Sequence, residues 1–519
     1  MSQAQAEGLP PLKGGTLVAA TIALSLATFM NVLDTTIANV SIPAISGDVG
    51  VSPSQGTWVI TSFAVANAIA VPLTGWLTQR FGSVKLFVTS VLLFVLASLL
   101  CGMSTSLPML IGFRVLQGLV AGPMIPLSQA LLLSSYPKSK AGLALAMWAM
   151  TTMVAPVMGP ILGGWISDNY TWPWIFYINV PTGLFAAWMA WSLLHKRETP
   201  TRKLPIDRVG LVLLVVWVGA LQIMLDKGKE LDWFASSEIV ALGVTAFVAF
   251  SFFLVWELTD KHPIIDLRLF ARPNFSIGVT ALSLGYGLFF ANVVLLPLWL
   301  QQYAGYTATW AGLVSAPVGI LALLLSPIVG KNVYRMDVRK VATFSFLVFA
   351  LVCYLRSRFS TDTDVFHIAL PQFIQGAAMA TFFVPLTALT LSGLSPDRVP
   401  AASGLANFVR ITCGAFGASV STTMWESRAA HHHTRLTEGI SDYSAPAQQA
   451  LSTLAQQGMS PQQAAGVIER QLNTQAFTMS ANDFFYLSAM LFLVLVALLW
   501  LSRPSAPAGA AAADAGGAH

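Results

Sequence analysis

Fourteen apolar stretches, each long enough to cross a bilayer as a helix, limit what this chain can fold into. A transmembrane helix needs about 20 apolar residues to cross roughly 30 Å of hydrocarbon. The stretches cover residues 16–42, 54–76, 85–106, 107–134, 141–166, 174–195, 208–226, 237–258, 275–300, 308–330, 339–357, 366–394, 400–425 and 483–502. Only 10% of the residues are charged, against about 25% in soluble domains. We therefore predict an all-α integral membrane protein with 14 transmembrane helices.

The distribution of basic residues predicts the orientation of these helices. An even number of spans places both termini on one side of the membrane. If that side is the cytoplasm, cytoplasmic segments hold 19 of the 28 Lys and Arg residues, and external segments hold seven. Because cytoplasmic loops are enriched in Lys and Arg, we expect cytoplasmic N- and C-termini. The first apolar run has no small-residue cleavage site, so we expect no cleaved signal peptide.

A weak internal repeat predicts how the spans are grouped. LQGLVAGPMIPL at 116–127 resembles IQGAAMATFFVPL at 374–386, which indicates two homologous six-helix halves around two additional spans, a 6+2+6 arrangement. Aligning the halves places Gln372 opposite Arg114, so we expect the basic residue in the N-terminal half only. The predicted units are a cytoplasmic N-terminus (1–15), an N-terminal bundle (16–195), two additional helices with linkers (196–274), a C-terminal bundle (275–502) with an external loop (426–482), and a disordered cytoplasmic tail (503–519). Within the external loop, Ser460-Pro461-Gln462-Gln463 has the pattern of a capping box with Pro at the first helical position, which favours a short helical hairpin there.

Two charged residues inside the spans are the predicted proton-coupling site. Asp34 lies in the first span, where a carboxylate is costly and indicates function. Asp34 lies nine residues before Pro43, and Arg114 lies seven after Leu107. At about 1.5 Å per residue, both lie roughly 10–14 Å below the outer edge. We expect them to share a cavity. The alternative for Asp34 is a structural ion pair or a wetted helix end.

Two glycine-containing motifs are predicted to control gating and packing. GWLTQRFGSVK at 75–85 has the composition of a tight cytoplasmic turn, although a simple positive-inside loop fits equally. APVMGPILGG at 155–164 predicts a helix that bends and packs closely, with ordinary helix packing as the alternative. The predicted gating and packing residues are Gly75, Gln79, Arg80, Gly82, Pro156, Gly159, Pro160, Gly163 and Gly164.

Polar side chains within the apolar spans are candidate substrate contacts, because drug cavities are mostly apolar with a few polar anchors. For each candidate a helix–helix hydrogen bond, or for Arg410 a structural pair, is the alternative. The candidates are Asn31, Asp34, Asn67, Gln129, Asn292, Trp299, Gln372, Gln375 and Arg410. We predict no metal site and no cofactor: Cys101, Cys353 and Cys413 have no metal-ligand spacing, and His431, His432 and His433 lie in a predicted polar loop without a carboxylate framework.

In their order along the chain, these motifs resemble the major facilitator superfamily. The loop signature at 75–85, RVLQG at 114–118 and the proline-glycine signature of antiporters at 155–164 all match. LDTTIANVSIP at 33–43 and WPWIFYINVP at 172–181, together with fourteen spans, resemble the EmrB/QacA drug:proton antiporters. One position departs from the superfamily pattern, because Gln79 stands where Asp is usual.

The resemblance implies proton-coupled export of hydrophobic drugs and toxic compounds from the bacterial inner membrane, driven by the proton gradient. It also implies an EmrA-type periplasmic adaptor, for which we expect residues 426–482 to be the contact, and a TolC-type outer-membrane channel. We hypothesise that Asp34 alternates between a protonated and a drug-bound state. If Arg114 approaches it in only one conformation, proton release depends on that conformation.

Other functions fit the sequence less well. A siderophore or endogenous metabolite could be the exported compound on the same fold, and an importer would share most of the motifs. A membrane-embedded enzyme would need a cluster of catalytic side chains near one bilayer face, and none is visible. Nucleic-acid binding is not expected, because the net charge is only +5 and no basic stripe with interleaved aromatics occurs.

Overall fold

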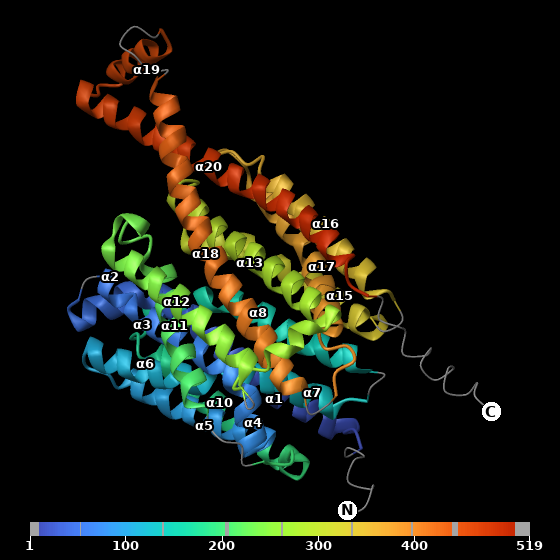
Figure 1. The fold of residues 1–519 in the computed structure, drawn as a ribbon. Helices are drawn as coiled ribbons and strands as arrows, with labels where there is room; N and C mark the ends of the chain where they lie inside the picture. Colours follow the sequence, from blue (N-terminus) through green and yellow to red (C-terminus); the bar gives the residue numbers. More distant parts are fainter. Residues whose placement is uncertain are drawn as a thin grey trace, which may run out of the picture.

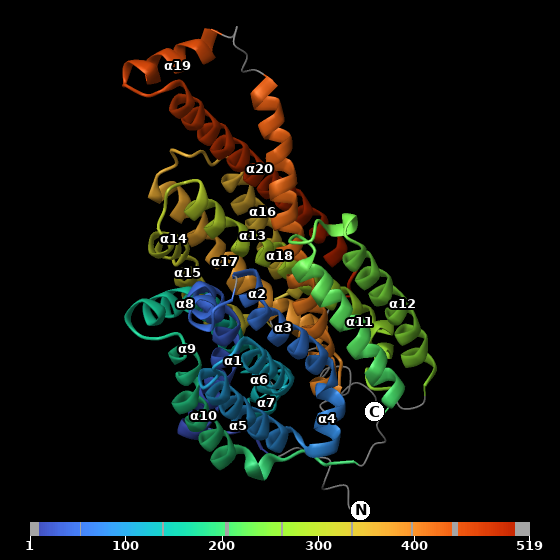
Figure 2. The ribbon, with the colours of Figure 1, turned by 90° about the vertical axis from the view of Figure 1, so that its left-hand side faces the viewer.

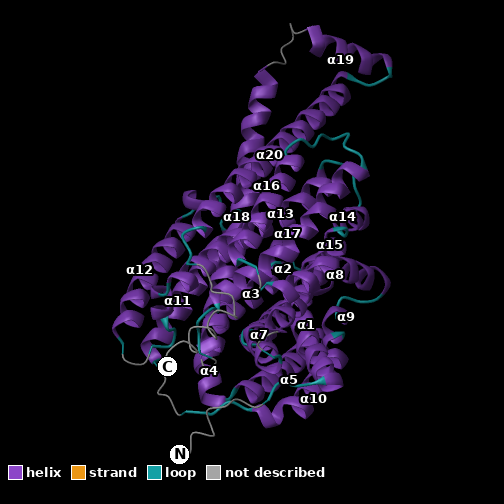
Figure 3. Ribbon diagram, turned by 90° about the vertical axis from the view of Figure 1, so that its right-hand side faces the viewer, coloured by secondary structure: helices purple, strands orange, loops and turns teal. Residues whose placement is uncertain are grey.

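The computed structural model describes residues 10–51, 53–137, 140–202, 207–260, 263–333, 336–395, 398–438 and 445–503. All regular structure in these ranges is helical (Figure 3), which confirms the all-α fold class. The predicted tail from residue 504 onward lies outside the described residues.

The helices before residue 200 pack mainly against one another and are called the N-terminal helix group. The closest pairs are α1 with α8, α3 with α6, and α5 with α10. The bounds are α1 (Gly14–Val49), α2 (Pro53–Gly56), α3 (Trp58–Ala70), η2 (Val71–Leu73), α4 (Thr74–Phe81), α5 (Ser83–Gly102), α6 (Leu107–Ala121), α7 (Met124–Ser135), α8 (Ala141–Asn169), α9 (Trp174–Tyr177), α10 (Asn179–Leu194) and η4 (His195–Arg197).

Small residues allow α1 and α8 to approach closely. A Cβ atom on Gly159 would lie 2.0 Å from the Thr36 hydroxyl, and one on Gly163 would lie 2.8 Å from the Ile37 carbonyl oxygen. Glycine at these positions therefore brings the two backbones into contact. Pro156 and Pro160 lie within α8, but their side chains are outside the described set.

Two further helices form an accessory pair, α11 (Arg208–Lys227) and α12 (Ser237–Thr259), with η5 (Trp233–Ala235) between them. Figure 2 shows the pair side by side at the edge of the molecule. α11 contacts α3 of the N-terminal helix group and α18. Trp217 of α11 packs against Phe253 of α12 and Phe408 of α18, so aromatic contacts attach the pair to the rest of the protein.

The remaining helices form the C-terminal helix group, in which α13 packs on α18, α16 on α17, and α16 on α20. Its bounds are η6 (Leu267–Ala271), α13 (Pro273–Gln302), α14 (Ala308–Ser315), α15 (Val318–Asn332), α16 (Val338–Arg356), α17 (Val365–Thr390), α18 (Val399–Glu438), α19 (Ala445–Gln456) and α20 (Pro461–Leu499).

The segment predicted as an external loop with a short helical hairpin is mostly helical, and most of it continues two helices of the bundle. α18 continues to Glu438, and α20 begins at Pro461. Figure 1 shows both helices projecting from the bundle with α19 across their ends. The capping box at Ser460 and Gln463, predicted from the sequence, is confirmed. A polar helix has no hydropathy signal, so the apolar pattern could not show that the spans continue outward.

Eleven helices among the described residues are long and apolar enough to cross a membrane. Three predicted spans are not among these eleven helices. They are 141–166, 174–195 and 400–425, which coincide with α8, α10 and α18. α10 has only 16 residues, and no stretch of α18 is apolar enough. The all-helical membrane fold is thus established, while the number fourteen remains a prediction.

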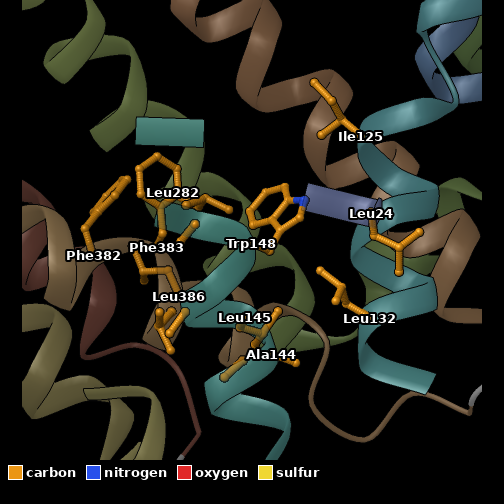
Figure 4. Close-up of a cluster of buried hydrophobic side chains, with 14 of the residues drawn as sticks. Leu24, Ile125, Leu132, Ala144, Leu145, Trp148, Leu282, Phe382, Phe383 and Leu386 are labelled. Atoms are coloured by element: carbon orange, nitrogen blue, oxygen red, sulfur yellow. The ribbon is translucent and has the colours of Figure 1, made fainter. Parts of the chain in front are cut away.

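A shared hydrophobic core joins the two helix groups. Figure 4 shows Trp148 and Leu145 of α8 near Leu282 of α13 and Phe383 of α17. Two glycines make the closest approach: a Cβ atom on Gly330 of α15 would lie 2.5 Å from the carbonyl oxygen of Gly142. The groups therefore meet backbone to backbone at the ends of α8 and α15 that carry these glycines.

Candidate functional site

Asp34 and Arg114 are in direct contact, a point that the sequence left open. The Arg114 guanidinium donates a 2.5 Å hydrogen bond to the Asp34 carboxylate, and both residues are at most 1% exposed. α1 supplies the acid and α6 the base. Their similar depth, predicted from the helical rise, places them face to face.

Three more polar side chains complete the environment of Asp34. Its second carboxylate oxygen accepts hydrogen bonds from Gln117 at 3.2 Å and from Asn179 at 3.0 Å. Both amides also donate to the hydroxyl of Ser98. These four residues come from α1, α5, α6 and α10, so the cluster connects four helices of one group.

Arg114 is held on several sides at once. It donates to the Val59 carbonyl oxygen at 2.9 Å and to the Gln117 side-chain oxygen at 2.7 Å. Its guanidinium carbon lies 4.3 Å from the ring centroid of Phe63 and 5.5 Å from that of Phe176. A buried charge needs such partners, because desolvation without them costs several kcal/mol. In this conformation the pair is enclosed by protein.

The sequence analysis did not single out Gln117, Asn179 or Ser98. Two of them lie within motifs that were recognised: Gln117 is three residues after Arg114 in RVLQG, and Asn179 is in WPWIFYINVP. The spacing of three residues places Gln117 on the same helix face as Arg114 and was the available signal. Ser98 carried no such signal.

The C-terminal helix group has a buried arginine of its own, contrary to the expectation that only the N-terminal half keeps one. Arg356 of α16 is 2% exposed and donates to Gln372 at 2.8 Å and to Gln375. The count of basic residues treated Arg356 as external, because it lies at the end of the predicted span 339–357. Arg356 comes from α16, whereas Gln372, the residue aligned with Arg114, lies on α17.

Asn292 and Trp299 of α13 are engaged inside the same group. Asn292 donates to the Leu288 carbonyl oxygen at 2.7 Å and to Ser488 at 3.3 Å. The Trp299 indole donates to Thr478 at 3.0 Å, and its ring stacks on Phe359. Both side chains are at most 2% exposed, so in this conformation they join helices to one another.

Gln129 and Arg410 lie together where the two groups meet. Asn407 donates to Gln129 at 3.4 Å and accepts from Arg410 at 2.6 Å. The Arg410 guanidinium carbon lies 4.7 Å from the Tyr286 ring and 5.9 Å from the Trp148 ring. One pocket, with room for about one water molecule, is lined by Gln129, Trp148, Asn407 and Arg410. A drug-sized ligand needs the groups to separate.

The last two polar candidates contribute to packing within the N-terminal helix group. Asn31 donates to the Ala121 carbonyl oxygen at 3.1 Å, linking α1 to α6. Asn67 is 7% exposed, and its side-chain oxygen has no hydrogen-bond partner in the part of the chain that the structure describes. Asn31 is therefore satisfied within the protein, whereas Asn67 keeps an acceptor available.

Glu198, which the sequence analysis did not identify, supplies a negative charge to the segment at 75–85. The Glu198 carboxylate accepts from the backbone amides of Val84 at 3.0 Å and Lys85 at 2.8 Å, at the start of α5. A carboxylate at a helix N-terminus is favoured by the unpaired amides and the helix dipole. A Cβ on Gly82 would lie 2.3 Å from that carboxylate, and its φ of 87° also requires glycine. Gln79 is exposed.

Two other residues of this turn make contacts of their own. The Arg80 guanidinium lies 5.5 Å from the Trp76 ring. A Cβ atom on Gly75 would lie 2.7 Å from the Cβ atom of Ala401, so α4 and α18 touch at this point.

The three histidines lie on a helix, and His432 and His433 have carboxylate partners, which corrects the expectation of a loop without a carboxylate framework. His432 hydrogen-bonds Asp483 at 2.9 Å, and His433 hydrogen-bonds Glu469 at 3.0 Å, each linking α18 to α20. Among the described residues, no three His, Cys, Asp or Glu side chains gather as metal ligands. The histidines therefore join the two helices of the extension.

Comparison with known proteins places this geometry in a family. A sequence profile described as "Major Facilitator Superfamily" matches residues 24–418. The chain is 56% identical to the multidrug export protein EmrB of Escherichia coli strain K12 over 510 residues, covering 98% of this chain and 99% of that protein. It is 52% identical to the fatty acid resistance protein FarB of Neisseria gonorrhoeae, with the same coverage.

A solved structure supports the fold independently. The human organic anion transporter MFSD10 (TETRAN) aligns with a TM-score of 0.57 at 12% identity, over 94% of this chain and 100% of that chain. The chain therefore belongs to the major facilitator superfamily: it is a multi-pass transporter of the bacterial inner membrane, not an enzyme, and a homologue of the EmrB multidrug export protein.

Proposed function

We propose that this protein exports hydrophobic drugs and toxic compounds across the inner membrane in exchange for protons, and that Asp34 and Arg114 couple the two movements. The observation that supports this most directly is the enclosed ion pair between α1 and α6. An intramembrane ionisable residue indicates an ion pathway by default. The relative named for multidrug export, at 56% identity over nearly the full length, supplies the cargo class.

The enclosed pair represents one state of the cycle. While Arg114 contacts Asp34, the cation favours the ionised carboxylate. Movement of α1 against α8, which the glycine contacts at Gly159 and Gly163 permit, would separate the pair and let the carboxyl take up a proton. One proton moving through 100 mV supplies about 2.3 kcal/mol. That free energy supports a roughly 50-fold gradient of a neutral drug.

The substrate path is proposed to lie between the two helix groups. We assign 16–195 and 275–502 as the two moving bundles, with fourteen spans in total and both termini in the cytoplasm. In that topology, the contact between Gly142 and Gly330 closes the cytoplasmic side. Gln129 and Arg410, at the meeting point of the groups, are then the polar anchors that a drug reaches when the groups separate. Asn67, with its free acceptor, is a further anchor.

Transport in reconstituted vesicles tests the coupling. Purified protein in proteoliposomes should move protons when drug is added, and Asp34→Asn should abolish this movement. Asp48→Asn is the matched control, because Asp48 lies on the same helix but is exposed, and it accepts a hydrogen bond from Trp172. Efflux driven by a pH gradient that survives in Asp34→Asn would refute the carboxylate mechanism.

We also propose that the projecting part of α18 and α20, with α19, contacts an EmrA-type periplasmic adaptor that leads to a TolC-type channel. The projection supports this because it extends beyond the bundle (Figure 1). Contacts between α18 and α20 hold the base of the projection together. The Trp425 ring packs edge-to-face against Phe477, and its indole donates a 2.8 Å hydrogen bond to the Phe477 carbonyl oxygen.

The adaptor contact can be tested without disturbing that base. Replacing residues 439–459 by a flexible linker removes α19 and leaves Trp425 and Phe477 in place. Cross-linking to the adaptor should be lost, while drug transport in proteoliposomes continues. Cross-linking at the wild-type level would exclude the tip of the projection as the docking site.

A further inference from the structure

A second buried carboxylate lies outside the cluster around Asp34, in the accessory pair. Glu257, near the end of α12, is 1% exposed. One of its oxygens accepts a 3.1 Å hydrogen bond from the Ile265 backbone amide. The other oxygen is buried and has no hydrogen-bond partner among the described residues. A buried carboxylate with only one of its oxygens hydrogen-bonded in this way is costly if ionised, because its lost hydration is only partly replaced.

The unpartnered oxygen points to another carboxylate. Asp207 caps the start of α11, where it accepts 2.9 Å hydrogen bonds from the Gly210 amide and the Trp256 indole. A Cβ atom on Gly210 would lie 2.2 Å from an Asp207 oxygen and 2.6 Å from the unpartnered Glu257 oxygen. The two carboxyl groups therefore converge on one point above Gly210.

Among the residues that the structure describes, the charged groups around Glu257 do not compensate a negative charge. The two that act on it are Asp207 and Asp260, both acidic. Arg208 of α11 and Arg268 of η6 are exposed, and neither forms an ion pair with Glu257. On η6, Asp266 faces Arg398 at 4.0 Å. Lys261 and His262 lie outside the described residues.

We propose that Glu257 is a proton-binding site whose proton is shared with Asp207 and holds the connector 263–272 against the accessory pair. Asp207 is satisfied as an anion by its two donors and by the N-terminus of α11. Two adjacent carboxylates do not both ionise readily. When the free oxygen of Glu257 carries a proton, it can donate a hydrogen bond to Asp207. The charge repulsion between the two carboxyl groups is then removed.

The connector responds to this proton because it is attached to the same carboxyl group. Ile265 donates its amide to Glu257, and Ile264, Ile265 and Leu269 are buried in a core shared with Phe253 of α12 and Phe408 of α18. Loss of the proton leaves an unpaired charge in that core, so Glu257 turns to water and releases Ile265. In the proposed topology this event faces the cytoplasm.

Infrared spectroscopy of the full-length protein in lipid nanodiscs, without drug or gradient, tests the site independently of transport. At neutral pH the wild type should show a carboxylic acid C=O band that Glu257→Gln lacks. Glu238→Gln is the matched control, because Glu238 is exposed on the same helix, and should retain the band. In Asp207→Asn the band should disappear at a pH lower by about one unit or more than in the wild type, because Glu257 ionises more easily once the neighbouring negative charge is gone.

Hydrogen exchange of the connector provides the second readout. As the pH rises, residues 263–272 of the wild type should exchange progressively faster than the same residues of Glu257→Gln measured at each pH, since glutamine remains neutral. Gln keeps an acceptor for Ile265, so this variant should fold. A band that is identical in wild type and Glu257→Gln, or connector exchange that stays equal in both at every pH, would overturn the proposal.

Discussion

Replacing Asp34 by Asn tests whether the ion pair with Arg114 is coupled energetically. The substitution keeps the size of the side chain and removes its charge. Arg114 then remains buried, at 0% exposure, without its opposite charge, and it keeps the Val59 carbonyl oxygen, Gln117 and two aromatic faces as partners. Removing one member of a buried pair costs about 3–5 kcal/mol, because the other charge is left uncompensated.

The aromatic faces and the remaining hydrogen bonds place the expected loss near the lower limit, about 3 kcal/mol. For a cooperative unit of 150–250 residues, each kcal/mol changes the melting temperature by about 2–4 °C. If the N-terminal helix group unfolds as such a unit, Asp34→Asn should melt roughly 6–12 °C below the wild type. Adding Arg114→Met removes the stranded charge, and the double variant should recover most of that loss.

Thermal unfolding followed by tryptophan fluorescence measures this in purified protein. Wild type, Asp34→Asn, Arg114→Met and the double variant form a double-mutant cycle, with Asp48→Asn as the control on the same helix. The coupling free energy should be about 2 kcal/mol or more. If the losses of the two single variants simply add in the double variant, the contact contributes no coupling and the reasoning is wrong.

Two further outcomes are expected. Gly330→Ala should weaken the contact between the helix groups, because its Cβ would lie 2.5 Å from the Gly142 carbonyl oxygen; Gly319→Ala on the same helix, with open space around it, should not. Spin-label distances between α8 and α15 should increase only in the first variant, and equal distances in both would refute the packing argument. At the start of α16, a hydrogen bond from Arg339 holds the pKa of the Asp337 carboxyl below its ordinary value of 3.8. A depressed pKa stabilises the fold above that value and loses its effect as the pH falls through the folded-state pKa. Melting temperatures of wild type and Asp337→Asn should therefore converge in acid, and a constant difference at all pH values would contradict this.

Local patterns in the sequence were sufficient for the helices and their ends. Hydropathy located apolar segments that the structure shows as helices, and the Ser460 capping box was readable because its partner is three residues away. The regular helical rise even placed Asp34 and Arg114 at matching depths. These properties depend on residues within about one turn of each other, and a sequence records such neighbours directly.

Which side chains meet was decided by the tertiary structure. Glu198 reaches the start of α5 from more than a hundred residues away, and Arg356 joins Gln375 from a neighbouring helix rather than from the repeat-equivalent position. Asn179 completes the Asp34 cluster in the same way. Each contact depends on how a helix is rotated about its axis and which neighbour it packs against. Those quantities are set by the packing of the whole bundle, so one chain's local sequence does not encode them.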